Sequence, residues 1–193
     1  ITPPNYDPHK KYPLLLAIHG GPEGIWAQHY VGGCESGGSS TLVPCWGSLA
    51  SQGFVVFQPN PRGSSGYGSK FLTANYADWG GHDYQDIMSG VDYLIEQGIA
   101  DPKHLALSGW SYGGYMASWV VTQTNRFKVA VDGAGITNLI SMVGTTDLTR
   151  NINEYFAQPF WVNHNLYLQR SPIMYTNKIA TPLLIVHGDA DNR

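Results

Sequence analysis

A Gly-x-Ser-x-Gly pentapeptide at residues 109–113 lies between an apolar run and a segment that favours a helix. The apolar run at residues 105–107 has the character of a buried strand, and residues 115–123 are compatible with a helix. A strand, a tight turn and a helix in this order hold a serine on a strained turn, where flanking glycines remove side chains that would collide. The arrangement predicts that Ser111 is a nucleophile; the alternative is an ordinary glycine-rich turn.

The rest of the chain alternates between apolar runs and segments with helical spacing, as an α/β fold with a parallel sheet requires. Continuous apolar runs, which are typical of strands buried on both faces, occur at residues 12–18, 54–57, 104–108, 127–132 and 182–186. Helices are expected at residues 46–52 and 83–96, a turn at 101–103, and short helices over the site within 144–178. The length of 193 residues fits one domain with a sizeable core.

The composition argues against several classes of function. A formal net charge of −3, with only 13% charged residues, gives no reason to expect nucleic acid or an anionic membrane as a partner. No apolar run has the length of a membrane span. Nothing near the two cysteines has metal-ligand spacing, and neither a metal nor a cofactor is expected. Cys34 and Cys45 flank a glycine- and serine-rich loop and form either a disulfide or two free thiols, which leaves the cellular compartment open.

A serine nucleophile needs a histidine base, an acid that orients the base, and N–H groups that bind the negative charge of the intermediate. Glycines directly after the first strand, at residues 19–22, favour an oxyanion loop over a plain turn. The main-chain N–H groups of Gly21 and Tyr112 are therefore the expected donors. The last strand ends in an acidic loop, in which either Asp189 or Asp191 is the expected acid.

The histidine base is the part of this machinery that residues 1–193 are expected to lack. In an α/β-hydrolase the chain order is serine, acid, histidine, and no histidine follows the acidic loop. The upstream His82, His164 and His187 are interpreted as structural or surface residues. Because the chain opens on Ile1 rather than Met and stops abruptly at Arg193, both ends are expected to be cuts through a longer protein. Because it lacks the histidine base, the fragment itself is expected to be inactive.

Five motifs in order closely resemble the prolyl oligopeptidase family of serine peptidases, particularly its dipeptidyl peptidase IV and acylaminoacyl peptidase branches. They are His-Gly-Gly-Pro at 19–22, Asn-Pro-Arg-Gly-Ser-Ser-Gly-Tyr-Gly at 60–68, Asp-Tyr-Gln-Asp at 83–86, Gly-Trp-Ser-Tyr-Gly-Gly-Tyr-Met at 109–116 and His-Gly-Asp-Ala-Asp-Asn-Arg at 187–193. The resemblance covers nearly the whole chain. It implies that residues 1–193 are a partial catalytic domain with an α/β-hydrolase fold and a mostly parallel sheet, truncated before the last strand and the histidine loop.

The resemblance also implies roles for individual residues. It makes Asp191, at the fifth position of His-Gly-x-x-Asp, the catalytic acid that acts with Ser111. Arg193 would bind a peptide carbonyl near the scissile bond. Ile136 and Leu139 would line an apolar specificity pocket.

Members of this family normally carry an N-terminal β-propeller that restricts entry to short peptides, and no propeller is expected within residues 1–193. The resemblance implies a serine peptidase that cleaves short peptides through an acyl-enzyme on Ser111, with the propeller of the same chain as its partner. The alternatives are a carboxylesterase, because the same machinery cleaves esters, and a non-catalytic binding or scaffold module. The preferred cleavage site and the oligomeric state stay open.

Overall fold

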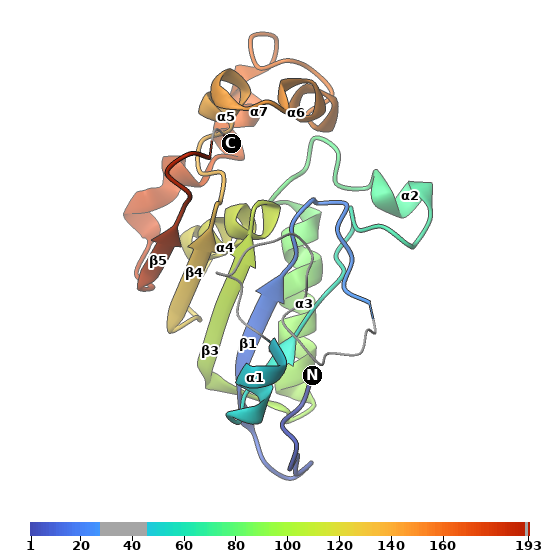
Figure 1. The fold of residues 1–193 in the computed structure, drawn as a ribbon, viewed down its shortest axis with the longest axis vertical. Helices are drawn as coiled ribbons and strands as arrows, with labels where there is room; N and C mark the ends of the chain where they lie inside the picture. The colour runs from blue at the N-terminus through green and yellow to red at the C-terminus, as the bar shows by residue number, and fades with distance from the viewer. Residues whose placement is uncertain (28–45, 192) are drawn as a thin grey trace.

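Five parallel strands form one sheet in the order β2-β1-β3-β4-β5 (Figure 1). The computed structural model describes residues 1–27, 46–191 and 193. The strands are β1 (Tyr12–Ile18), β2 (Val55–Phe57), β3 (Ala100–Trp110), β4 (Val129–Gly133) and β5 (Leu183–Val186). Every neighbouring pair runs parallel, which confirms the predicted fold class. The carboxyl ends of the strands consequently meet at one edge of the sheet.

Side chains of β1 alternate between two hydrophobic clusters, one on each face of the sheet. Leu14, Leu16 and Ile18 belong to the larger cluster, whereas Leu15 and Ala17 belong to the smaller one. Successive side chains of a strand point to opposite faces, so a strand that is covered on both faces must be apolar throughout. The uninterrupted apolar run of β1 therefore follows from its place inside the sheet.

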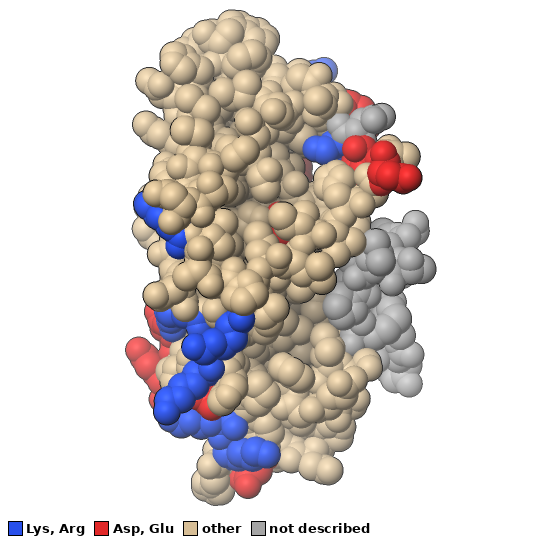
Figure 2. Space-filling view, turned by 90° about the vertical axis from the view of Figure 1, so that its left-hand side faces the viewer, with Lys and Arg blue, Asp and Glu red and all other residues tan. Residues whose placement is uncertain are grey.

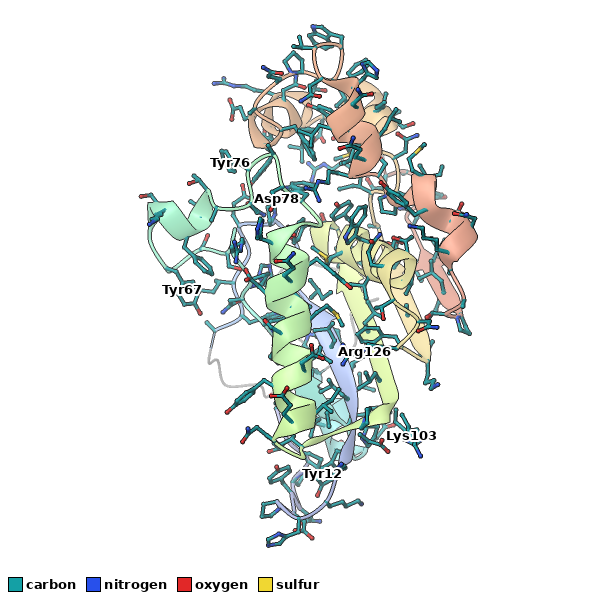
Figure 3. The ribbon with its side chains drawn as sticks, turned by 180° about the vertical axis from the view of Figure 1, so that it is seen from behind. Tyr12, Tyr67, Tyr76, Asp78, Lys103 and Arg126 are labelled. Carbon is teal, nitrogen blue, oxygen red and sulfur yellow. The ribbon has the colours of Figure 1, made fainter. Side chains whose placement is uncertain are left out.

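Helices cover both faces of the sheet (Figures 1 and 3). Two long helices, α3 (His82–Glu96) and α4 (Tyr112–Gln123), pack on the face of the larger cluster, and the short α1 (Trp46–Ser51) packs on the opposite face. Every residue of α4 except Gln123 is buried. Because α4 directly follows β3, the central strand and an almost completely buried helix hold Ser111 between them.

A layer of short helices lies beyond the carboxyl ends of the strands (Figure 1). It consists of α5 (Leu139–Thr145), α6 (Thr149–Tyr155) and α7 (His164–Gln169), and the 3-10 helix η1 (Pro172–Lys178) then leads to β5. Asn138 caps α5, because its side-chain oxygen accepts the N–H groups of Ile140 (3.0 Å) and Ser141 (3.2 Å). These elements confirm the short helices predicted within residues 144–178.

The turn predicted at residues 101–103 is wrong, because these residues lie within β3. Ala100 pairs with Tyr12 of β1, and the register then shifts so that Leu105 pairs with Leu14. The residues in between form a bulge, which places turn-forming residue types inside a strand.

Other features lie outside the prediction or outside the described residues. The helix α2 (Ser69–Leu72) is absent from the prediction, because four residues are too few to show a periodic pattern. The loop that contains Cys34 and Cys45 lies outside the described residues, so their pairing stays untested. Among the described residues, no helix combines the length and the apolar character needed to cross a membrane.

Candidate active site

Ser111 lies at the sharp turn between β3 and α4, at the carboxyl edge of the sheet. Its φ of 59° and ψ of −119° are values that a residue with a side chain rarely adopts. Hydrogen bonds hold the turn on both sides: Ser111 N–H donates to Gly133 O at 2.8 Å, and Tyr115 N–H donates to Ser111 O at 2.9 Å. The strand–turn–helix context predicted for Ser111 is therefore present, with backbone strain of the kind that clusters at functional sites.

Two glycines of the pentapeptide allow α4 to pack directly on the sheet. A Cβ added to Gly113 would lie 2.9 Å from the carbonyl carbon of Ile18 and 3.0 Å from His19 O, inside van der Waals contact. A Cβ added to Gly109 would lie 2.7 Å from Gly113 Cα. Both positions face main chain, which cannot rotate away as a side chain does. The close approach of β1, β3 and α4 thus depends on glycine.

The loop after β1 passes directly beside this turn. A Cβ added to Gly20 would lie 3.1 Å from Trp110 O and 3.4 Å from Ser111 Cβ. The next residue, Gly21, has a φ of 126°, which favours glycine. The structure thus brings both predicted oxyanion residues to the serine, since Tyr112 follows it in the chain and Gly21 follows the glycine that contacts it. Their role as donors stays a prediction.

His19 holds the base of the same loop. It is only 6% exposed, and its Nε2 lies 2.9 Å from Ser64 Oγ while its Nδ1 lies 2.9 Å from Gly20 O. Burial lowers the pKa of His19, which favours the neutral imidazole. Ser64 Oγ also donates to Pro61 O at 2.7 Å. The imidazole therefore ties the loop after β1 to the loop after β2.

The acidic loop after β5 lies one strand away from Ser111. Gly133 of β4 pairs with Trp110 on one side and with Val186 on the other. Ala134 N–H continues the contact by donating to Val186 O at 2.7 Å. Because only β4 separates the two strand ends, the structure brings the predicted acid loop and Ser111 to the same part of the sheet edge.

Within the acidic loop, hydrogen bonds from main-chain groups hold Asp191 in place. Its N–H donates to Gly188 O at 3.2 Å, and its Oδ1 accepts the N–H of Arg193 at 2.8 Å. Its Oδ2 lies 3.6 Å from His187 Nε2. Both Asp191 and Asp189 are exposed, so the choice of Asp191 rests on the family motif and stays a prediction.

The predicted substrate-binding residues fall into two groups. The Arg193 guanidinium donates two hydrogen bonds to Asp147, from Nε to Oδ1 at 2.6 Å and from Nη2 to Oδ2 at 2.8 Å. These bonds hold the pKa of Asp147 below its usual value. Ile136 and Leu139 are buried in the larger hydrophobic cluster, with 8% and 0% exposure. Whether any of the three contacts a substrate is untested.

Two buried carboxylates beside the turn are missing from the prediction. The Tyr112 hydroxyl donates to Asp83 Oδ2 at 2.6 Å, and burial raises the pKa of Asp83 to about 7. Burial likewise raises the pKa of Asp132, to which Ser118 Oγ donates. The sequence does carry one signal for Asp83: it stands four residues before Ile87 and so continues the apolar face of α3. In the described part of the chain, no three metal-binding side chains come together.

Comparison with known proteins adds independent findings. A family model described as the prolyl oligopeptidase family matches residues 46–193. An uncharacterized peptidase, YuxL of Bacillus subtilis, is 39% identical over 200 residues, and dipeptidyl-peptidase 5 of Schizosaccharomyces pombe is 34% identical over 197 residues. Both alignments include 100% of this chain but only 28% and 27% of the relatives, so the chain spans little more than a quarter of their length.

Solved structures show the same architecture. The uncomplexed acylaminoacyl peptidase of Pyrococcus horikoshii matches with a TM-score of 0.81 and 28% identity, over 97% of this chain and 28% of that one. A puromycin-hydrolyzing peptidase of Mycobacterium tuberculosis matches with a TM-score of 0.76 and 28% identity, over 93% of this chain and 26% of that one. The predicted fold is thereby confirmed.

Proposed function

Because this chain belongs to the prolyl oligopeptidase family, we propose that it is the catalytic part of a serine peptidase that hydrolyses short peptides through an acyl-enzyme on Ser111. The observation that carries the proposal is the position of Ser111, on a strained turn at the carboxyl edge of the sheet with the glycine loop after β1 against it. Its relatives are named as a peptidase, a dipeptidyl-peptidase and an acylaminoacyl peptidase, which favours peptide over ester substrates.

In the proposed reaction, Ser111 Oγ attacks the carbonyl carbon of the scissile peptide bond and gives its proton to a histidine. The carbonyl oxygen becomes an oxyanion, which accepts hydrogen bonds from the N–H groups of Tyr112 and Gly21. The intermediate then expels the amine, which takes the proton from the histidine. Water attacks the remaining ester by the same route and regenerates the serine. Asp191 orients the histidine and stabilises its charged form.

In this proposal the histidine comes from a further segment of the same protein. The exposure of β5 supports such a segment, because Leu184 and Ile185 are 58% and 60% exposed although they point to opposite faces of the sheet. Ile173 and Met174 of η1 are also exposed, at 46% and 52%. Figure 2, which views the molecule from this side, shows wide areas without charged side chains. An edge strand that is apolar and uncovered on both faces is expected to pack against more of the protein.

The substrate contacts are part of the same proposal. Arg193 would exchange its exposed partner Asp147 for a peptide carbonyl near the scissile bond, an exchange that costs little because solvent screens the ion pair. Ile136 and Leu139 would support the apolar wall of the specificity pocket from within the core. A β-propeller elsewhere in the chain would limit entry to short peptides.

The test uses the full-length protein and two substrates, a dipeptidyl anilide and a short acyl ester. We expect the anilide to be hydrolysed and a fluorophosphonate probe to label the wild type but not Ser111→Ala. Turnover of the ester alone would replace the peptidase with a carboxylesterase. A wild type that is neither labelled nor active would point to a non-catalytic module. Residues 1–193 alone are expected to be labelled far more slowly than the full-length protein.

The acidic loop offers a matched pair of variants. We expect Asp191→Asn to lower kcat by about three to four orders of magnitude, as the loss of an orienting carboxylate does elsewhere. Asp189→Asn changes the same charge two residues away and is expected to keep kcat within about tenfold of the wild type. The opposite order would assign the acid to Asp189.

A further inference from the structure

Tyr112 presents two different groups to two different parts of the molecule. Its main-chain N–H begins α4 beside Ser111, where we place the oxyanion. Its side chain is completely buried, with the ring packed edge-on against Trp79 at a centroid distance of 5.1 Å. The hydroxyl donates to Asp83 Oδ2 at 2.6 Å. One residue thus connects the candidate oxyanion site to a carboxylate in the core.

Asp83 is itself held rigidly. Its Oδ1 accepts the N–H of Tyr84 at 2.7 Å. It lies in the first turn of α3, where the helix dipole favours a negative charge, and none of it is exposed. The hydrogen bond from Tyr112 therefore ties the first turn of α4 to a fixed point in the first turn of α3.

We propose that Asp83 is a positioning residue for the oxyanion site: it holds the Tyr112 phenol, and through the phenol it fixes where the Tyr112 N–H points. This inference rests on the proposed function, in which that N–H stabilises the tetrahedral intermediate. An oxyanion donor acts only when it lies about 2.7–3.1 Å from the developing charge. A first turn of α4 that is free to tilt therefore slows the chemical step and leaves substrate binding largely unchanged.

The same contact makes the oxyanion site sensitive to pH. The titratable and charged groups that interact with Asp83 are Asp78 before α3, Arg62 after β2, and Tyr112 and Tyr115 on α4. Asp86 pairs with Arg62, while His82 and Arg170 pair with Asp78. Figure 3 shows Asp78 at the start of α3. Both arginines bond other carboxylates, at 2.7 Å and 2.6 Å, so burial prevails and raises the pKa of Asp83 to about 7. Protonation removes the charge that strengthens the phenol hydrogen bond.

Two tyrosines of α4 provide a matched pair for the test. Tyr112→Phe removes the hydroxyl that bonds Asp83, whereas Tyr115→Phe removes an equally buried hydroxyl that has no hydrogen-bond partner among the described residues. In the full-length protein we expect Tyr112→Phe to lower kcat for the anilide by about tenfold with KM unchanged, a fraction of the hundredfold cost of losing a donor outright. Tyr115→Phe is expected to keep both constants within about twofold of the wild type.

The pH profile supplies a readout that a merely structural contact would not move. Asp83→Asn preserves a polar contact, because its amide donates to the phenol oxygen, but it does not titrate. Below pH 7 we expect kcat of the wild type to fall up to about tenfold further than that of Asp83→Asn, since protonation of Asp83 weakens the phenol contact in the wild type alone, whereas the histidine base takes up its proton in both proteins. If Tyr112→Phe fails to fold, this comparison decides alone.

Each outcome of these measurements has one meaning. Equal kcat values for the two Tyr→Phe variants, or an acid limb that Asp83→Asn leaves unchanged, would overturn the positioning role while the peptidase function stands. A wild type that neither hydrolyses the anilide nor accepts the fluorophosphonate at Ser111 would refute the proposed function and, with it, this inference.

Discussion

Gly113→Ala tests how closely α4 must approach the sheet. The added Cβ would lie 2.9 Å from the carbonyl carbon of Ile18 and 3.0 Å from His19 O, and closer still to Ile18 O. Ile18 is the last residue of β1 and pairs with Gly109 of β3, so these atoms cannot move without disturbing that pairing. Relief therefore requires the first turn of α4, and with it Ser111, to move away from the sheet by about 1 Å, the amount by which such contacts overlap.

The expected cost follows from two opposing terms. Overpacking a well-packed interior costs about 1–3 kcal/mol, and contact with main chain belongs at the upper end of this range. Alanine in place of glycine in a helix returns up to about 1 kcal/mol. The net loss of about 2 kcal/mol corresponds to a fall of roughly 4–8 °C in Tm. If Ser111 is the nucleophile, as proposed, a shift of 1 Å in its position is expected to lower the rate by about a hundredfold.

Thermal unfolding and fluorophosphonate labelling of the full-length protein measure the two effects of Gly113→Ala. Gly144→Ala is the control, because a Cβ at Gly144 in α5 meets nothing within 4 Å. That change is expected to raise stability by about 0.5–1 kcal/mol and to leave labelling unchanged. If both variants have the same Tm and the same labelling rate, the close approach of α4 to β1 does not position the serine.

Two further changes address buried and partly buried charges. Burial raises the pKa of Asp83 from 3.8 to about 7, so the folded wild type holds a proton that the unfolded chain releases between these pH values. The free energy of unfolding of the wild type therefore falls by up to about 4 kcal/mol as the pH rises through this window, whereas that of Asp83→Asn does not change for this reason. Urea titrations from pH 4 to pH 8 measure this change, and a constant difference would contradict it. Arg62→Met removes the two side-chain hydrogen bonds from Arg62 to Asp86, each 2.7 Å long, and is expected to lower the free energy of unfolding by about 2 kcal/mol. Arg62→Lys keeps the charge but cannot form both hydrogen bonds, and the same titrations are expected to show about half of this loss in the free energy of unfolding.

Elements whose pattern is set by burial are predictable from the sequence. The strand β1 is apolar throughout because both of its faces are covered, and α3 shows helical spacing because only one of its faces is. The bulge of β3 is not predictable, since it depends on how Ala100 and Leu105 pair with a strand almost ninety residues earlier in the chain. Residues 101–103 are of types that favour turns, so the local pattern predicts a turn where the structure has a bulge within β3.

Some residues of the candidate site are likewise predictable from the sequence, whereas others depend on how the chain packs. Ser111 and Gly21 are predictable, because a strained turn and a positive φ have local signatures in glycine. The contact of Asp83 with Tyr112 joins residues 29 positions apart on two helices, and only the packing of those helices creates it. A motif shows which residue types are present, whereas the burial that changes the pKa of Asp83 is a property of the folded chain.

The strand order has a consequence for hydrogen exchange. Within residues 1–193, β3 pairs with a strand on each side, so its amides are expected to exchange slowly, whereas β5 pairs with one strand, has exposed side chains and is expected to open by local fluctuation. Ser111 follows the most protected strand, and Asp191 follows one of the least protected. In residues 1–193 these two groups of the carboxyl edge are thus expected at opposite ends of the range of local stability, and a brief detachment of β5 would displace Asp191 while Ser111 stays folded.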